Sequence, residues 1–159
     1  MSMVANTFSD FATMPKPKIK DQDIVEITNS AVQIFKNANL KIKTTKDKII
    51  WPIDRTQWIR VLTNLIQNAI QAVPENRTPK INLLISLEKN KLKMNIEDNG
   101  TGIVKKDQLK IFEPKFTTKT AGMGLGLAIV KNIIDSLNGS ISFKSEPNKG
   151  TKFSITLKK

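Results

Sequence analysis

The amino-acid sequence predicts an α/β (α+β) two-layer sandwich, in which helices cover one face of a mixed, mainly antiparallel sheet. Two observations favour this class: strand patterns come mostly in adjacent pairs, and they do not alternate strictly with helices as in a doubly wound nucleotide-binding fold. The size of the chain is a third, because 159 residues, 39% of them hydrophobic, can bury one sizeable core.

The N-terminal part of the chain predicts a connector followed by a helix. Residues 1–20 are interpreted as the end of a preceding element plus a linker, because Pro15 and Pro17 do not allow a helix to continue. Asp21 or Asp23 can cap the next helix, which is expected to end near residues 38–39. Its apolar residues repeat at helical spacing: Ile24, Ile27, Ala31, Ile34 and Phe35.

The next segment predicts two short strands and the longest helix. The strands are expected at residues 40–44 and 48–53, with a turn at 46–47 between them. A helix that starts at Asp54 runs to about residue 73, where Pro74 stops it.

A hairpin and a glycine-containing loop are expected after this helix. Strand patterns at residues 81–87 and 92–97 flank a short polar turn, which is typical of a hairpin. A loop at 98–103 and a short helix around 106–111 follow. Residues 112–123 are expected to be irregular.

The C-terminal part predicts a helix and two strands. The helix spans residues 124–137 and is closed by Asn138-Gly139, where a glycine suits the left-handed C-terminal position. The strands are expected at residues 140–145 and 151–157, on either side of a Pro-Asn-Lys-Gly turn.

Composition excludes several kinds of chemistry. The chain has no cysteine and no histidine, which excludes disulfides, thiolate metal sites, Ser-His-Asp and Cys-His catalysis, and histidine-bound zinc or iron. The net charge of +12 is spread without a run of four basic residues, so it is interpreted as a lysine-rich surface rather than a nucleic-acid site. No apolar run is long enough to span a bilayer, so a cytoplasmic chain without direct membrane contact is expected.

Four segments carry residue types that suit an anionic ligand. Residues 61–73 are uncharged, with amides opposite an apolar stripe, and amides can coordinate a hard cation. Residues 97–103 place a carboxylate at a strand end beside two glycines. The glycines of residues 122–126 open a helix whose N–H groups attract anions. In residues 111–120, the hydroxyls of Thr117 and Thr118, the cation of Lys119 and two phenylalanines suit a mobile flap.

Each segment taken alone also fits a purely structural role. The amide face can pack against another element, the glycine pairs can form tight turns, and the flap can be a surface loop anchored by its phenylalanines. No P-loop pattern G-x-x-x-x-G-K-[ST] is present, and the G-x-G-x-G spacing differs from that of dinucleotide-binding folds.

Taken in chain order (61–73, 97–103, 111–120 and 122–126), the four segments resemble the N, G1, F and G2 boxes of one ATP-binding domain. Sensor histidine kinases, topoisomerases, chaperones and mismatch-repair ATPases share this domain (the GHKL superfamily). The resemblance covers about residues 50–159. The stretch FEPKFTTKTAGMGLGLAIVKNII is especially similar to sensor histidine kinases. The segment SDFATMPKPK is similar to the junction before this domain in nitrogen-regulation sensor kinases. The resemblance implies a Bergerat-type fold, with the end of a dimerisation helix and its linker at 1–20 and an ATP-binding catalytic domain at 21–159.

The resemblance also implies roles for matching residues, with ATP and Mg²⁺ as cofactors. Asn68 would bind Mg²⁺, and Asn64 would face the phosphates and bound water. Asp98 would accept a hydrogen bond from the adenine amino group, while Gly100 and Gly102 would make room for the nucleotide.

Further residues are expected at the lid and at the phosphates. Lys119 would meet the terminal phosphates and, with Asn64, forms the expected catalytic pair. The residues expected to contact nucleotide are Asn64, Asn68, Asp98, Gly100, Gly102, Ile103, Thr117, Thr118, Lys119, Gly122, Gly124, Leu125, Gly126 and Thr151. Two positions depart from the family pattern: Lys115 stands where an aromatic often occurs, and Gln71 where many relatives have a basic residue.

Asn64 favours a kinase over an ATPase. ATPases with this fold carry a glutamate four residues before the metal-binding asparagine, and that glutamate activates water. An amide cannot act as a general base, and losing such a base typically costs about 10²–10⁴ in rate. Phosphoryl transfer to a protein relies chiefly on positioning and charge neutralisation.

The sequence therefore predicts a catalytic fragment whose phosphoacceptor histidine lies elsewhere, because this chain has none. The expected partners are the histidine-containing dimerisation domain of the same kinase and, downstream, a response regulator. The parent protein can be cytoplasmic or anchored in the bacterial inner membrane. Three alternatives stay open: an anti-sigma-type serine kinase, a GHKL ATPase that hydrolyses ATP with water, and a basic nucleic-acid module.

Overall fold

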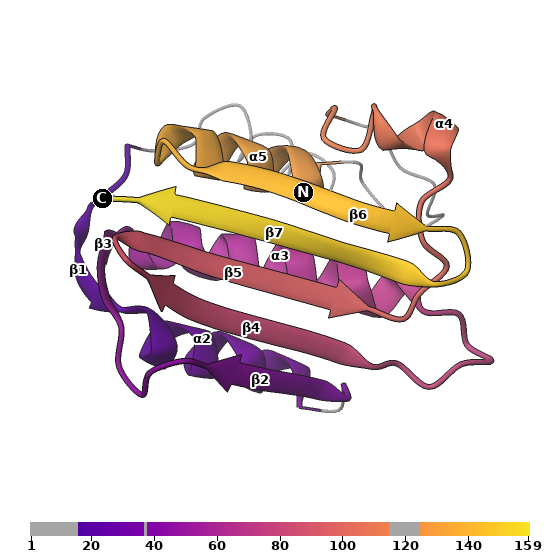
Figure 1. Cartoon of the computed structure of the whole chain (residues 1–159), viewed down its shortest axis with the longest axis horizontal. Coiled ribbons are helices and arrows are strands. Elements are labelled where there is room, and N and C mark those ends of the chain that lie inside the picture. Colours follow the sequence, from indigo (N-terminus) through magenta and orange to yellow (C-terminus); the bar gives the residue numbers. More distant parts are fainter. Residues whose placement is uncertain (1–15, 37, 115–124) are drawn as a thin grey trace, which may run out of the picture.

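The computed structural model describes residues 16–36, 38–114 and 125–159. A five-stranded sheet in the order β2-β4-β5-β7-β6 forms one layer, and the helices lie on one side of it (Figure 1). The strands are β2 (Leu40–Thr44), β4 (Ile81–Glu88), β5 (Lys91–Asp98), β6 (Ser140–Glu146) and β7 (Gly150–Lys158). The helices are α2 (Ile24–Val32), α3 (Arg55–Ala72), α4 (Lys105–Gln108) and α5 (Gly126–Ser136). The predicted two-layer class is confirmed.

The main core lies between the sheet and the helices. Alternate residues of β5 and β7 are buried, so one face of these strands is apolar and the other polar. Helix α3 runs behind the central strands and buries its apolar stripe there, including Trp58, Leu62 and Ile66 (Figure 1). Among the described residues, no helix is both long and apolar enough to cross a membrane.

Strand pairing differs from the prediction at the N-terminal edge of the fold. Strand β2 pairs in parallel with β4, whereas β3 (Ile50–Ile53) leaves the main sheet and pairs with β1 (Lys20–Asp23). Strand β1 was not predicted, because its sequence KDQD has no alternation of apolar and polar residues. It starts at the last residue of the segment that was interpreted as a linker.

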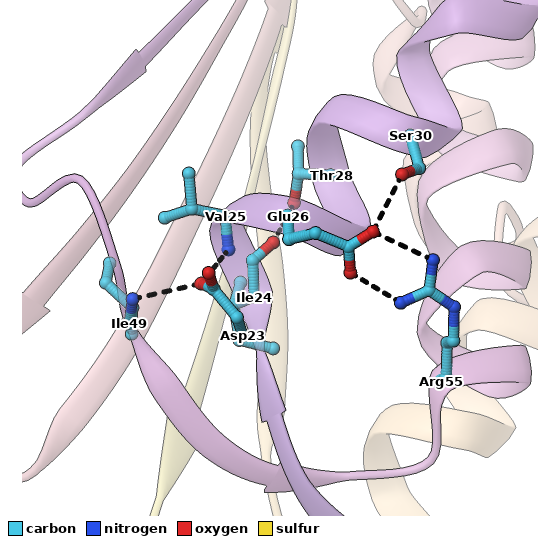
Figure 2. Close-up of polar contacts among 8 residues, drawn as sticks. All are labelled: Asp23, Ile24, Val25, Glu26, Thr28, Ser30, Ile49 and Arg55. Atoms are coloured by element: carbon cyan, nitrogen blue, oxygen red, sulfur yellow. Dashed lines mark hydrogen bonds and ion pairs between the residues drawn. The ribbon is translucent and has the colours of Figure 1, made fainter.

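The start of α2 was predicted correctly, and its end was not. Asp23 caps the helix by accepting the Val25 N–H at 3.1 Å, and it also accepts the Ile49 N–H at 3.2 Å (Figure 2). After Val32 the chain tightens into a 3₁₀ turn, whose three residues per turn change the direction of the following side chains. Ile34, which was expected on the apolar face, is 67% exposed for this reason.

Helices α2 and α3 are joined by an ion pair at the surface. The Arg55 guanidinium donates to both carboxylate oxygens of Glu26, at 2.6 and 3.1 Å (Figure 2). The hydrogen bonds from Arg55 and from the Ser30 hydroxyl hold the pKa of Glu26 below its usual range. Because the pair is exposed, it fixes the orientation of the helices more than it adds stability.

The longest helix and the hairpin match the prediction closely. Asp54 caps α3 by accepting the Gln57 N–H at 3.0 Å, and it also accepts the Lys18 N–H at 2.6 Å. Strands β4 and β5 pair along their whole length, from Ile81↔Asp98 to Glu88↔Lys91.

Two smaller predictions were wrong. Helix α4 is one turn long and ends at Gln108, short of the expected residue 111. At the end of α5 the left-handed residue is Asn138, with a φ of 56°, and not the following glycine. Gly139 is needed for space instead, because a Cβ there would lie 2.8 Å from the backbone carbonyl oxygen of Thr156.

Candidate functional site

The amide face of α3 is placed at the edge of the helical layer. Asn64 and Asn68 are half-buried and lie one turn apart on the same face, whereas Gln67 and Gln71 are exposed. The side-chain amide of Asn64 donates to the Arg60 carbonyl at 2.8 Å, which fixes the direction of its Oδ1 atom. The predicted pair of asparagines is therefore presented on one side of this helix.

The start of α5 meets Asn64. A Cβ at Gly126 would lie 3.0 Å from Asn64 Oδ1, so the glycine permits the two helices to approach closely at this point. Leu125 caps α5 through its backbone, and its side chain is buried in the core. If Leu125 contacts a ligand, it must do so through its backbone atoms. The first turn of an 11-residue helix has N–H groups that favour anions.

Asp98 lies at the end of β5 and is only 6% exposed. Its Oδ1 atom accepts the Gly100 N–H at 2.8 Å and the Thr151 N–H at 3.3 Å. Thr151, 5% exposed, is the next residue of β7 beyond the registered pair Glu97↔Lys152, so the predicted carboxylate and threonine lie side by side.

Close backbone contacts shape the loop after Asp98. A Cβ at Gly100 would lie 2.5 Å from the Ala72 carbonyl oxygen at the end of α3. Gly102 has a φ of 72°, and a Cβ there would lie 2.1 Å from the Glu146 carbonyl oxygen. Only glycine meets both demands at position 102. These contacts hold the loop between α3 and the β6–β7 turn.

A cluster of hydroxyl and amide groups behind this loop was not predicted. Ser145 Oγ accepts the Ile103 N–H at 2.7 Å and lies 2.8 Å from Thr151 Oγ1. The Gln108 side chain donates to the carbonyls of Ile103 and Ser145, at 3.0 and 3.4 Å. Ile103 packs its side chain against the core, so its polar contacts are made by its backbone. A serine in an alternating strand carries no signal that would single it out.

A second unpredicted support is Arg77. Its guanidinium donates to the carbonyls of Asn99 and Gly100, at 2.6 and 3.1 Å. The Asn99 side chain accepts the Lys80 N–H at 2.8 Å and donates to the Thr78 carbonyl at 2.9 Å. The segment 77–80 thus fixes the loop that carries Asp98 from the side opposite the β6–β7 turn. An arginine and an asparagine in polar loops gave no sequence signal of this role.

Part of the predicted site lies outside the described residues. This applies to the expected flap from residue 115 onward and to the first glycines before α5: Lys115, Thr117, Thr118, Lys119, Gly122 and Gly124.

The described residues fit a magnesium-bound nucleotide. Two half-buried amides on α3 offer oxygen atoms, which Mg²⁺ prefers, next to the start of α5, which favours phosphate. Towards the sheet, a buried carboxylate and a buried hydroxyl lie beside a glycine-containing loop, as a polar base edge requires. The arrangement thus offers one end that can hold a cation and phosphate, and another end with hydrogen-bond acceptors.

The sequence is similar to known proteins over most of its length. Residues 53–159 match the family model described as "Histidine kinase-, DNA gyrase B-, and HSP90-like ATPase". The sensor protein TdiS of Thauera aromatica is 30% identical over 158 residues, covering 93% of this chain and 29% of that protein. The nitrogen regulation protein NtrY of Azorhizobium caulinodans is 32% identical over 166 residues, covering 98% of this chain and 21% of that protein. The chain thus spans less than a third of these curated relatives.

Solved structures agree with the sequence comparison. The catalytic domain of the histidine kinase ThkA superposes with a TM-score of 0.80 at 32% identity, covering 89% of this chain and 96% of that one. A full-length ShkA structure in complex with AMPPNP, at 19% identity and a TM-score of 0.83, shares the fold over 97% of this chain and 35% of that one. The chain therefore belongs to the histidine kinase-, DNA gyrase B- and HSP90-like ATPase family, as a catalytic domain of the histidine kinase type.

Proposed function

We propose that this chain binds Mg²⁺-ATP and transfers the γ-phosphate to a histidine on a helical hairpin outside the chain. The chain itself contains no histidine, so the acceptor must come from another segment or another protein. An imidazole nitrogen attacks the γ-phosphorus in line, the new N–P bond forms, and the bond to the β-phosphate oxygen breaks as ADP leaves with its electron pair.

Asn64 is the residue that favours phosphoryl transfer to a protein over hydrolysis of ATP by water. Its Nδ2 atom is committed to the Arg60 carbonyl, and its Oδ1 atom faces the first residue of α5. The Oδ1 atom of this amide can accept a hydrogen bond from water, but the amide cannot take a proton from an attacking water. The site therefore holds ATP without supplying the base that hydrolysis requires.

The other described residues bind and orient the nucleotide. Asp98, held by the N–H groups of Gly100 and Thr151, accepts a hydrogen bond from the adenine amino group. Asn68 would hold Mg²⁺, which would supply neutralisation of the phosphate charge. Lys119 remains assigned to the terminal phosphates by the family resemblance alone.

The proposed partners follow from the same reaction. The histidine hairpin would be the dimerisation domain of the parent kinase, and a response regulator would receive the phosphoryl group from it. The relatives TdiS and NtrY are more than three times as long as the part that matches this chain, so we propose these partners, together with a membrane-anchored parent, as features of the full-length protein.

The test is phosphoryl transfer in trans. The chain is mixed with labelled ATP, Mg²⁺ and a separately made cognate hairpin, and the label on the hairpin histidine is measured with its acid lability. We expect acid-labile label on the wild-type hairpin and none on a hairpin whose histidine is replaced by glutamine. The Gln67→Ala variant, altered on the exposed face of the same helix, should transfer label as well as the wild type does.

The alternatives give different outcomes in this assay. Acid-stable label on a partner protein would indicate a serine kinase. Steady phosphate release that falls strongly in Asn64→Ala, with no labelled histidine, would indicate an ATPase. DNA binding whose log K falls linearly with log salt, without nucleotide binding, would indicate a nucleic-acid module.

A further inference from the structure

The hydroxyl group of Ser145 lies where three backbone and side-chain groups meet. Ser145 on β6 is registered opposite Thr151 on β7, and the two hydroxyl oxygens are 2.8 Å apart. The Ile103 N–H donates to Ser145 Oγ at 2.7 Å. The Gly150 carbonyl oxygen lies 3.2 Å from the same atom, in hydrogen-bond geometry with Ser145 as the donor.

Only one placement of the hydroxyl protons satisfies all three contacts. The Ile103 N–H uses one lone pair of Ser145 Oγ, and the Gly150 carbonyl can only accept, so the Ser145 proton goes to Gly150. The Thr151 hydroxyl must then donate its own proton to the second lone pair of Ser145. Towards any further group, Thr151 Oγ1 presents lone pairs only.

The oriented threonine lies beside a carboxylate. The backbone N–H of Thr151 is bonded to Asp98 Oδ1, and both side chains are buried on the helix side of the sheet. The carboxylate of Asp98 is an acceptor as well. Two acceptors are therefore neighbours, and the acceptor character of the Thr151 hydroxyl depends on Ser145.

We propose that Ser145 is a positioning residue for base selection, because it keeps the Thr151 hydroxyl an acceptor next to Asp98. The inference rests on the proposed binding of adenine nucleotides at this site and deepens it. A 6-aminopurine offers N–H donors to this pair, whereas a 6-oxopurine brings an oxygen against two acceptors. Leaving buried acceptors unpaired is what gives a polar site its strongest discrimination.

Removing the Ser145 hydroxyl should weaken the discrimination rather than the binding in general. In Ser145→Ala the Thr151 hydroxyl loses the group that receives its proton, so it can rotate and donate to a 6-oxo oxygen. We expect the ratio of the Kd for ITP to the Kd for ATP to fall about tenfold, the size of one buried hydrogen bond. ATP and ITP suit this comparison because they differ only at the 6-position and in the N1 proton.

The experiment measures the Kd of ATP and of ITP by calorimetry, with excess Mg²⁺, for the whole chain and its variants. Ser145→Thr keeps a hydroxyl and should keep the wild-type ratio. Ser142→Ala, three residues away on the exposed face of β6, is the matched control and should also keep it. Thr151→Val removes the acceptor itself and should lower the ratio even if Ser145→Ala does not fold.

The outcomes separate this inference from the proposed function. A ratio that falls in Ser145→Ala and Thr151→Val but not in Ser145→Thr supports the role of Ser145. If Ser145→Ala weakens ATP and ITP by the same factor, Ser145 is merely structural and the inference is overturned. If the wild-type chain binds neither nucleotide, the proposed function fails first, and the inference falls with it.

Discussion

Asp98 shows how a single residue joins sequence and function. The sequence predicted it as a nucleotide-binding carboxylate, and the structure places it in a buried position with two backbone donors on Oδ1. Those donors come from the loop after β5 and from β7, so the orientation of the carboxylate is fixed before any ligand arrives. Such preorganisation lowers the entropy cost of binding.

Replacing the carboxylate by an amide tests this residue. Asp98→Asn keeps the shape of the side chain but turns one acceptor into a donor, which opposes the adenine amino group. We expect ATP affinity to fall by about 1–3 kcal/mol, measured by calorimetry. The control is Glu97→Gln on the exposed face of the same strand, which should leave the affinity unchanged. Equal affinities for the wild type and Asp98→Asn would contradict the assignment of Asp98.

The proposed metal-binding role of Asn68 is tested by measuring how Mg²⁺ changes nucleotide affinity. In Asn68→Ala the amide oxygen proposed to bind Mg²⁺ is absent, so the increase in nucleotide affinity produced by Mg²⁺ should largely disappear. The measurement is a nucleotide titration with and without Mg²⁺, and Gln67→Ala provides a control from the exposed side of α3. A full Mg²⁺ response in Asn68→Ala would show that the metal lies elsewhere.

The limits of prediction at the residue scale follow from the kind of contact. Asp98, Asn64 and Asn68 could be predicted because their residue types are unusual for their local pattern. Ser145 and Arg77 could not, because they act on backbone atoms that are 42 and 22 residues away in the chain. Only the folded topology brings those atoms together.

At the scale of elements, segment 77–80 and the β6–β7 turn both contact the loop that follows β5. Arg77→Ala leaves the Asn99 and Gly100 carbonyls without their charged donor, so we expect the free energy of unfolding to fall by about 1–3 kcal/mol. Lys149→Ala removes a lysine from an exposed pair with Glu146 and should change it by less than about 0.5 kcal/mol. Urea denaturation compares the two variants. Equal small effects would show that Arg77 does not support the loop.

The start of α3 predicts a dependence of stability on pH. Burial raises the pKa of the Asp54 carboxyl, but the N–H groups of Lys18, Gln57 and Thr56 outweigh this and leave it below its ordinary value of 3.8. The folded protein therefore binds this proton less readily than the unfolded chain does. The stabilisation by Asp54 is fully present above its ordinary pKa and is lost as the pH falls through the lowered pKa of the folded state.

Asp54→Asn is the matching variant, because asparagine also caps helices but does not titrate in this range. Urea denaturation of both proteins, from neutral pH down to about pH 2, should show a stability difference that shrinks as the pH falls below about 4. A difference that stays constant across this range would mean that Asp54 titrates alike in the folded and unfolded states.

The elements themselves were predictable to the extent that their signals were local. The long helix and the β4–β5 hairpin follow from periodicity, capping and turn residues, which lie within each segment. The β1–β3 ribbon and the parallel pairing of β2 with β4 join segments that are about 30 to 40 residues apart. No local pattern specifies these partners, so strands could be predicted at 40–44 and 48–53, but the strands that they pair with could not.

At the scale of the whole molecule, none of the helices in the described ranges covers the face of the sheet opposite α3 (Figure 1). Exposed lysines lie on this face in two neighbouring strands, where Lys144 of β6 is registered opposite Lys152 of β7, and Lys41 and Lys43 extend it at β2. Part of the net charge of +12 therefore lies on the face opposite Asp98 and Thr151. The positive charge is therefore a property of this lysine-rich surface, whereas the candidate nucleotide site is built from amides, glycines and one aspartate.

The central claim is that one nucleotide site joins α3, the start of α5 and the loop after β5. The most direct test is the change in backbone ¹⁵N–¹H NMR shifts during titration of the whole chain with Mg²⁺ and AMP-PNP. The claim predicts saturable shifts at Asn68, Asp98, Gly126 and Thr151, and none at Glu26, which pairs with Arg55 at the start of α3. Shifts absent from those four residues, or centred on α2, would contradict it.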